Sequence, residues 1–201
     1  KVVIVDPRHN NSCVYADEWI PIKPGTDLAL ILAMANVLVS EGLYDQDYIA
    51  NYTVGFEDWA SRLPEYTPEW AEEITGIPAE TITRLAHEMW EAAPASSIEQ
   101  GWRAAFGCAH KNSGETARAL CLFNTLLGCW GAEGGAVFYP SVSAGKLSDS
   151  RFAAPPAPSG KILGSAQYPL AAASMGVATY ALEQIPEGLV KGVIFYQSNC
   201  V

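Results

Sequence analysis

The sequence predicts an α/β fold in which helices cover both faces of a mostly parallel sheet. Short runs of β-branched and aromatic residues alternate with longer apolar stretches of helical spacing, which is typical of parallel strands joined by helices. The predicted strands are residues 2–5, 95–100 and 192–196, and residues 19–22 are an extended piece that Pro21 restricts to an edge strand or a connector. Polar residues or glycine follow them. Because ligands of parallel sheets bind beyond the carboxyl ends of the strands, we expect a ligand site at this edge.

The predicted helices are bounded by residues that start or stop helices. In Pro24-Gly25-Thr26-Asp27 a turn is followed by an N-cap signature, and the helix that begins at Asp27 runs to about Ser40. This helix is apolar on every side, so we expect it to be buried against a sheet or other helices. Further helices are predicted over residues 45–51, 56–63, 68–75, 78–92 and, capped by Ser113, 114–130.

Residues 1–201 are predicted to form a single α/β domain, since this length suffices for one hydrophobic core. Within it, residues 136–174 are rich in Pro, Ser, Gly and Ala, which predicts a long loop. The chain opens in a predicted strand, stops just after another and does not begin with Met. We therefore expect it to be an internal fragment of a larger protein.

The composition restricts the class of ligand. The formal net charge is −10, whereas a protein that binds nucleic acid through its phosphates needs a basic face, so no nucleic-acid partner is expected. A nucleotide cofactor remains compatible, because backbone N–H groups and a few acids can hold it. No run of about 18 apolar residues predicts a membrane span. Five cysteines without regular spacing argue against a disulfide framework.

Polar residues follow three of the predicted strands. They are Asp6-Pro7-Arg8, Gln100-Gly101 and Asn199. Although the predicted sheet is Rossmann-like, the G-x-G-x-x-G fingerprint and the P-loop are both absent, so a generic NAD enzyme is not supported. From the residues alone, the sequence predicts an α/β nucleotide-binding domain.

The order of several local patterns is more specific than any one of them. Val2-Val-Ile-Val-Asp-Pro-Arg8 precedes Trp19-Ile-Pro-Ile-Lys-Pro-Gly-Thr-Asp27, and Tyr66-Thr-Pro-Glu-Trp-Ala71 and Asn124-Thr-Leu-Leu-Gly128 follow. This succession resembles the third domain of the catalytic subunit of molybdopterin oxidoreductases, the DMSO reductase family, over residues 1–135 and 191–201. The surroundings of Gly101-Trp102-Arg103 look most similar to the thiosulfate and polysulfide reductase branch.

The resemblance implies a cofactor-binding domain of a larger oxidoreductase. Members of the family hold molybdenum between two molybdopterin guanine dinucleotides and carry a [4Fe–4S] cluster in an N-terminal domain absent from this chain. The matching domain cradles one guanosine diphosphate arm and is not catalytic alone. The implied substrate is a sulfur oxyanion or another small respiratory compound. The implied partners are the remaining domains, an iron–sulfur electron-transfer subunit and a membrane anchor subunit, in the bacterial periplasm or at a membrane.

Carried over by position, the resemblance points to particular contacts for the cofactor. Asp6 and Asp27 would accept hydrogen bonds from ribose or guanine, and Gly25 and Thr26, in the turn that Pro24 begins, would place backbone N–H groups near the diphosphate. Pro7, Arg8, Gln100, Gly101 and Asn199 are further candidates, although the family often has Asn-Pro where this chain has Asn199-Cys200.

Plainer readings stand beside these. Asp27 can be an ordinary acid in a first helical turn, and Asp6-Pro7 an ordinary strand exit. The whole protein can also be a non-catalytic scaffold subunit with the same fold. The large iron–sulfur subunit of respiratory complex I resembles the family in this way. A free-standing nucleotide-binding module is the third reading.

Overall fold

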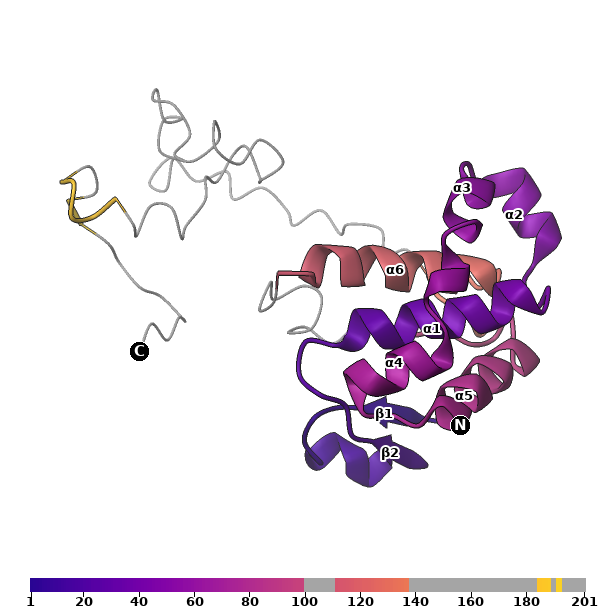
Figure 1. Cartoon of the computed structure of the whole chain (residues 1–201), viewed down its shortest axis with the longest axis horizontal. Coiled ribbons are helices and arrows are strands. Elements are labelled where there is room, and N and C mark those ends of the chain that lie inside the picture. Colours follow the sequence, from indigo (N-terminus) through magenta and orange to yellow (C-terminus); the bar gives the residue numbers. More distant parts are fainter. Residues whose placement is uncertain (100–110, 138–183, 189–190, 193–201) are drawn as a thin grey trace, which may run out of the picture. The chain divides into compact units, whose positions relative to one another are not determined.

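The computed structural model describes residues 1–99, 111–137, 184–188 and 191–192 of the chain (Figure 1). The chain divides into two units, residues 1–141 and residues 142–201, and the described helices and strands all lie in the first. Most of the predicted loop over residues 136–174 and the predicted strand at 192–196 therefore lie outside the described residues. No helix in the described ranges is long and apolar enough to cross a membrane.

Helix α1 (Asp27–Ser40) forms the centre of the first unit. The helices α4 (Pro68–Thr75), α5 (Ala79–Glu91) and α6 (Ser113–Leu126) pack around it (Figure 1). Because nearly all of its side chains are apolar, most of α1 is buried, with Ala33, Ala35 and Leu38 fully so, whereas Leu28, Leu32, Asn36 and Val39 are half-buried. The predicted bounds and burial of this helix are confirmed.

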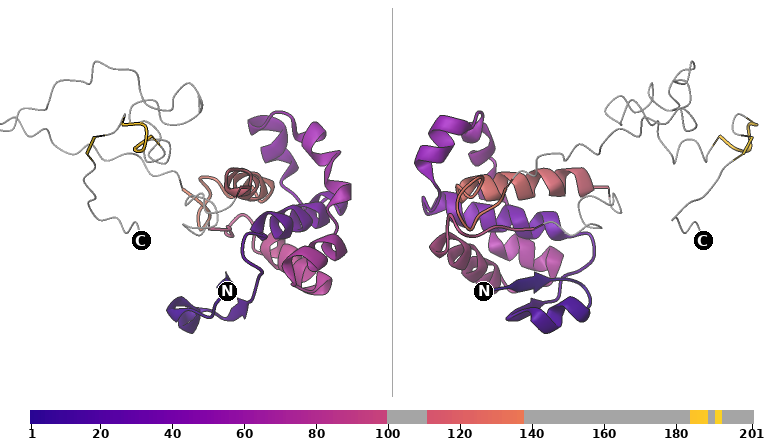
Figure 2. Two further views of the ribbon diagram at one scale, coloured as in Figure 1. Left: turned by 60° about the vertical axis from the view of Figure 1, so that its left-hand side comes forward. Right: turned by 180° about the vertical axis from the view of Figure 1, so that it is seen from behind.

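Two short strands form a parallel sheet. Strand β1 (Val3–Val5) pairs with β2 (Glu18–Ile20), with Ile4 opposite Trp19, and the 3₁₀ helix η1 (Asn11–Tyr15) connects them. Both views in Figure 2 place the α-helices to one side of this sheet. The parallel pairing is as predicted. The Rossmann-like arrangement with helices on both faces stays a prediction, and the described part is a mixed, mainly helical fold with a small parallel sheet.

The predicted strand over residues 95–100 is wrong for its described part. Residues 95–99 form no strand. The backbone of Ile98 instead bonds to the side chain of Asn124 on α6, so the hydrogen bonds that a strand would make to a neighbour are made to a carboxamide.

The remaining helices begin and end close to the predicted residues. They are α2 (Gln46–Tyr52), α3 (Phe56–Ala60) and the 3₁₀ helix η2 (Leu63–Glu65). The side chains of Asp45 and Thr67 cap α2 and α4 by accepting the N–H groups of Tyr48 and Trp70. Helix α6 is present as predicted, but its predicted cap is wrong, because Asn112 occupies the N-cap position and Ser113 is the first, buried residue of the helix.

A network of charged side chains joins α5 to the sheet. The Arg84 guanidinium bonds both carboxylate oxygens of Glu18 on β2, and its Nη1 lies 2.8 Å from Oε1 of Glu88. Lys1 Nζ lies 3.1 Å from Oε2 of Glu18 and 2.7 Å from Oε2 of Glu88. Arg84 and then Lys1 hold the pKa of Glu18 below its ordinary 4.5, and Lys1 and then Arg84 lower the pKa of Glu88.

We expect this network to make the fold less stable in acid. Because the folded-state pKa values of Glu18 and Glu88 are lowered, their stabilisation is complete above their unfolded pKa and is lost as pH falls through the folded pKa. Arg84→Met should reduce this acid sensitivity. Because the side chains of Arg84 and Glu18 are 37% and 29% exposed, the substitution should lower the free energy of unfolding at neutral pH by only about 0.5–1 kcal/mol.

Thermal unfolding midpoints of the wild type and of Arg84→Met, measured at neutral pH and near pH 3, check this expectation. Arg62→Met, which removes an exposed arginine next to η2, is the matched control. If Arg84→Met loses as much stability on acidification as the wild type does, other carboxylates cause the acid sensitivity.

Candidate cofactor site

The turn before α1 is held by its own backbone and by Thr26. Gly25 has φ +78°, a left-handed conformation that suits glycine, and the Thr26 N–H lies 3.3 Å from the Lys23 carbonyl oxygen. The Thr26 hydroxyl donates to the same oxygen at 2.6 Å and so does not cap the helix. Pro24 is exposed at the outside of this turn.

At the start of helix α1, several hydrogen-bonding groups have no partner among the residues that the structure describes. Thr26 accepts the N–H groups of Ala29 and Leu30 through its carbonyl oxygen. Within the described ranges, no group accepts from the N–H groups of Asp27 and Leu28, and no group donates to the half-buried Asp27 carboxylate. A helix start with free donors favours an anion, and the Asp27 carboxylate can accept from donors such as those of ribose or guanine.

A second helix begins beside this turn. Asn112, the N-cap residue of α6, donates through Nδ2 to the Gly25 carbonyl oxygen at 3.3 Å. Helices α1 and α6 also pack side by side (Figure 1). Each helix start carries partial positive charge, so two of them at one place reinforce the preference for an anionic group such as a diphosphate.

Asp6 lies at the carboxyl end of β1, and its carboxylate is already bonded. Oδ1 accepts the Arg8 N–H at 2.8 Å, and Oδ2 accepts from Asn10 Nδ2 at 3.0 Å. The Asp6 carbonyl oxygen accepts from Trp19 Nε1 at 3.0 Å. These bonds shape the exit from β1, which supports the plainer reading of Asp6 as a strand exit. Each carboxylate oxygen keeps one more lone pair for a ligand.

Pro7 and Arg8 are exposed after this exit. A hollow of about 530 Å³ follows, lined by Arg8, His9, Asn10, Asn11 and Ser12. The parallel strands end at Val5 and Ile20, and the Asp6 N–H donates to the Ile20 carbonyl oxygen at 3.2 Å. The Asp6 exit and the turn that follows β2 thus leave the sheet at the same end, as the sequence predicts.

Three predicted contacts lie outside the described residues, namely Gln100, Gly101 and Asn199. Two asparagines that the sequence analysis did not select make bonds that tie distant segments together: Asn112 bonds Gly25 in the turn before α1, and Asn124 bonds the backbone of Ile98. The sequence signal for Asn124 is a polar residue among the apolar positions of a buried helix, where an unbonded carboxamide would be costly.

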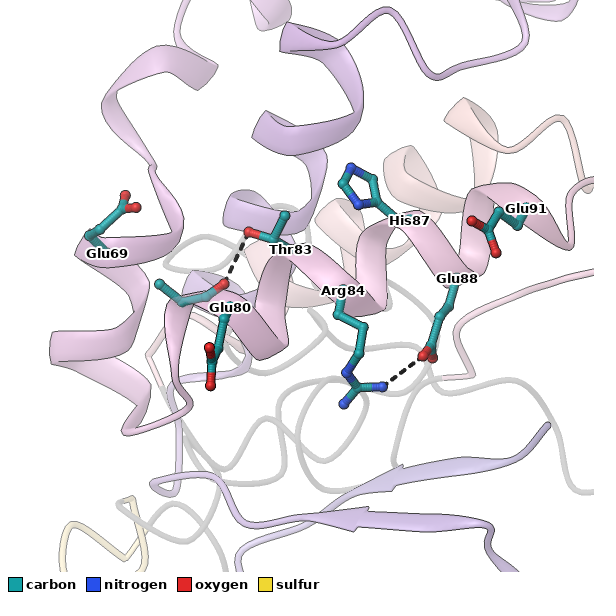
Figure 3. Close-up of a pocket in the computed structure, with 8 residues that line it drawn as sticks. Glu69, Glu80, Thr83, Arg84, His87, Glu88 and Glu91 are labelled. Atoms are coloured by element: carbon teal, nitrogen blue, oxygen red, sulfur yellow. Dashed lines mark hydrogen bonds and ion pairs between the residues drawn. The ribbon is translucent and has the colours of Figure 1, made fainter.

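A larger hollow, of about 640 Å³, lies along α5 and contains none of the predicted contacts (Figure 3). The pKa of Glu69 is lowered by hydrogen bonds from the backbone N–H of Glu69 and from the Thr67 hydroxyl, and the pKa of Glu88 is lowered by bonds to Lys1 and Arg84. Both carboxylates therefore stay charged. A lining with this many carboxylates repels a diphosphate. The residues lining this hollow are Glu69, Ala79, Glu80, Thr83, Arg84, His87, Glu88 and Glu91.

No group of three or more His, Cys, Asp or Glu side chains that could hold a metal ion occurs among the described residues. The described part of the site thus offers hydrogen-bond donors and acceptors for a nucleotide. It shows helix starts, a turn glycine and one free carboxylate, all at one end of a small parallel sheet.

Comparison with known proteins identifies the class to which this fold and site belong. The family model described as Molybdopterin oxidoreductase matches residues 1–188. The chain therefore belongs to the molybdopterin oxidoreductase family, which confirms the resemblance seen in the sequence.

Individual relatives agree with this assignment. The chain is 39% identical over 156 residues to dimethyl sulfoxide reductase DmsA of Haemophilus influenzae, with 67% of this chain and 19% of that protein covered. It is 40% identical over 135 residues to the thiosulfate reductase subunit PhsA of Salmonella typhimurium, with 67% and 17% covered. The structure of acetylene hydratase from Pelobacter acetylenicus matches with a TM-score of 0.58 and 35% identity, covering 64% of this chain and 17% of that one.

The chain thus spans about a fifth of the length of the curated relatives it matches. These relatives carry different names, including a dimethyl sulfoxide reductase and a thiosulfate reductase at nearly equal identity. The similarity consequently does not single out the thiosulfate and polysulfide branch.

Proposed function

We propose that this chain is the cofactor-binding domain of a molybdenum bis(molybdopterin guanine dinucleotide) oxidoreductase, and that it cradles one guanosine diphosphate arm. The observation that supports this most is the start of α1. There the N–H groups of Asp27 and Leu28 and the Asp27 carboxylate, which have no hydrogen-bond partner among the described residues, lie at the carboxyl end of a parallel sheet, in a chain of the molybdopterin oxidoreductase family.

In this proposal the residues of the chain bind and orient the cofactor. The turn from Pro24 to Thr26 and the start of α1 take the diphosphate, and Asp27 accepts from the guanine or ribose donors. Asp6 and Arg8, which follow β1, line the edge of the same site. When bound, the molybdenum cofactor supplies the oxidation–reduction chemistry, and this domain supplies no catalytic residue of its own.

The whole enzyme is proposed to reduce a sulfur oxyanion or another small respiratory substrate. Relatives named for dimethyl sulfoxide, thiosulfate and arsenate reduction support a small oxidised substrate. We also propose that electrons arrive through a [4Fe–4S] cluster in another domain and through an iron–sulfur subunit, with a membrane anchor subunit completing the assembly.

Asp27→Asn in the full-length enzyme tests the proposal. The amide keeps the size of the side chain, but it replaces one acceptor oxygen with a donor that faces the guanine or ribose donors. Losing a charge-assisted hydrogen bond and leaving a donor unmatched should weaken binding by about 2–4 kcal/mol. Molybdenum and released guanine nucleotide per protein should both fall.

Asp47→Asn is the matched control, because Asp47 is also an acid in the first turn of a helix but is exposed on α2. If Asp27 is merely a helix-stabilising acid, the two variants will behave alike and keep wild-type cofactor content. A wild-type protein that contains neither molybdenum nor guanine nucleotide would instead support a scaffold subunit of the same fold.

A further inference from the structure

Asn112 joins the starts of two helices. It is the N-cap residue of α6, a position where an asparagine side chain usually accepts an N–H of its own helix. Here the side chain makes no such bond to α6, and its Nδ2 instead donates to the Gly25 carbonyl oxygen at 3.3 Å. The two residues are 87 positions apart, so this bond belongs to the tertiary structure and not to the start of α6.

The backbone of Asn112 is a firm anchor for this bond. Its carbonyl oxygen accepts from the Thr116 N–H at 2.8 Å and from the Thr116 hydroxyl at 2.9 Å, and Thr116 is buried. Helix α6 packs along α1 in the same direction, so both helices begin at the same end (Figures 1 and 2). A short side chain on such a backbone can hold its partner in one place.

The bond holds one peptide plane of the turn before α1. The Gly25 carbonyl oxygen and the Thr26 N–H belong to the same planar peptide unit, so they turn together. Asn112 bonds the oxygen, and the Lys23 carbonyl oxygen accepts the N–H at 3.3 Å, so this peptide is held on both sides. Gly25 has φ +78° and no side chain that could pack in the turn, so the bond supplies a restraint that glycine itself lacks.

The held peptide leads directly into α1. Asp27 and Leu28 follow Thr26, and their N–H groups have no partner among the described residues. Consecutive peptide planes are linked by only two dihedral angles, so a rotation of the Gly25–Thr26 peptide changes the direction of these N–H groups. The direction in which α1 presents its first donors therefore depends on the bond from Asn112.

We propose that Asn112 is a positioning residue for the diphosphate of the bound nucleotide. By holding the Gly25–Thr26 peptide, it keeps the N–H groups of Asp27 and Leu28 in the direction in which they bind, without touching the cofactor itself. This inference rests on the proposed function. A role confined to starting α6 would be met by any good N-cap residue, whereas the positioning role requires a donor that reaches Gly25.

The test is Asn112→Ser in the full-length, cofactor-loaded enzyme. Serine is about as good an N-cap residue as asparagine, but its hydroxyl ends one bond closer to the backbone and leaves the 3.3 Å contact with Gly25 unbridged. The substitution is uncharged, so it adds no repulsion toward a phosphate. Asn36→Ser is the matched control, since Asn36 lies on α1 away from its start, and its Nδ2 donates to the Leu63 carbonyl oxygen at 2.7 Å.

The readouts are the thermal unfolding midpoint and the rate at which bound guanine nucleotide is lost during dialysis. Asn112→Ser should keep the midpoint close to that of the wild type and lose nucleotide about three- to tenfold faster, the effect of one lost hydrogen bond. Asn36→Ser should show the opposite pattern, with a lower midpoint and nucleotide loss close to the wild-type rate. In the double variant with Asp27→Asn, the rate should rise by less than the product of the two single effects, because both changes act at the start of α1.

Wild-type nucleotide loss from Asn112→Ser, or loss that merely follows the thermal midpoint across the variants, would mean that Asn112 only starts α6, and the inference would be overturned. A double variant whose rate equals the product of the single effects would overturn it as well. If Asp27→Asn loses nucleotide while Asn112→Ser retains it, the proposed function stands and only this inference fails. A wild-type protein without guanine nucleotide overturns both. Should Asn112→Ser not accumulate as folded protein, Asn112→Thr, with a capping hydroxyl of the same reach, takes its place.

Discussion

Gly128→Ala should lower the free energy of unfolding by about 2–5 kcal/mol. Gly128 is buried after the end of α6 and has φ +62°, a conformation that costs an alanine about 1–2 kcal/mol. A Cβ atom there would also stand only 3.0 Å from Cβ and Cγ of Asp45, and such overpacking costs about 1–3 kcal/mol. Asp45 cannot move away freely, because it caps α2 and its N–H donates to the Leu126 carbonyl oxygen at 2.8 Å.

Urea unfolding of Gly128→Ala and Gly42→Ala separates the two causes. Gly42 ends α1 with φ +71°, but no atom lies within 4 Å of the position its Cβ would take, so Gly42→Ala carries the backbone strain alone. We expect Gly128→Ala to be the more destabilising by at least about 1 kcal/mol. Equal losses in the two variants would mean that Asp45 yields to the added methyl group.

Phe123→Ala should lower the free energy of unfolding by about 3–5 kcal/mol. Phe123 is fully buried on α6, among the residues that pack this helix against α1. Removing the ring loses its burial and leaves a cavity that these helices close only partly. The neighbouring Leu122 is only half-buried, so Leu122→Ala should cost clearly less.

Equilibrium urea unfolding, with the slope of free energy against denaturant held comparable, measures this difference. A loss for Phe123→Ala no larger than that for Leu122→Ala would contradict the placement of Phe123 in the core between α6 and α1.

Local sequence determined most helix boundaries of this protein. The bounds of α1 and α4 agree with the prediction because their signals are local: Pro68 and the Thr67 cap start α4, and Gly42, at φ +71°, ends α1. The buried face of α5, with Ile82, Leu85 and Ala86, also follows from spacing alone, since residues three and four apart lie on one side of a helix.

The family was likewise readable from the order of motifs, and the Pro-Gly-Thr-Asp turn lies where the sequence predicted it, at the start of a buried helix. The sequence did not show which of the carboxylates near this turn already accept hydrogen bonds within the protein. Asp6 and Asp27 are the same residue type after successive strands, yet each carboxylate oxygen of Asp6 already accepts one hydrogen bond, from Arg8 or Asn10, whereas Asp27 has no such partner in the described ranges.

Tertiary structure alone decided the partners of residues far apart in the chain. Residues 95–99 lie in a predicted strand, but the group that meets Ile98 is the carboxamide of Asn124, and the group that meets Gly25 is the carboxamide of Asn112. Helix capping and periodicity act over a few residues, so the sequence displays them directly. Which polar side chain meets a distant backbone group depends on how buried helices pack, and that is determined only when the whole core excludes water.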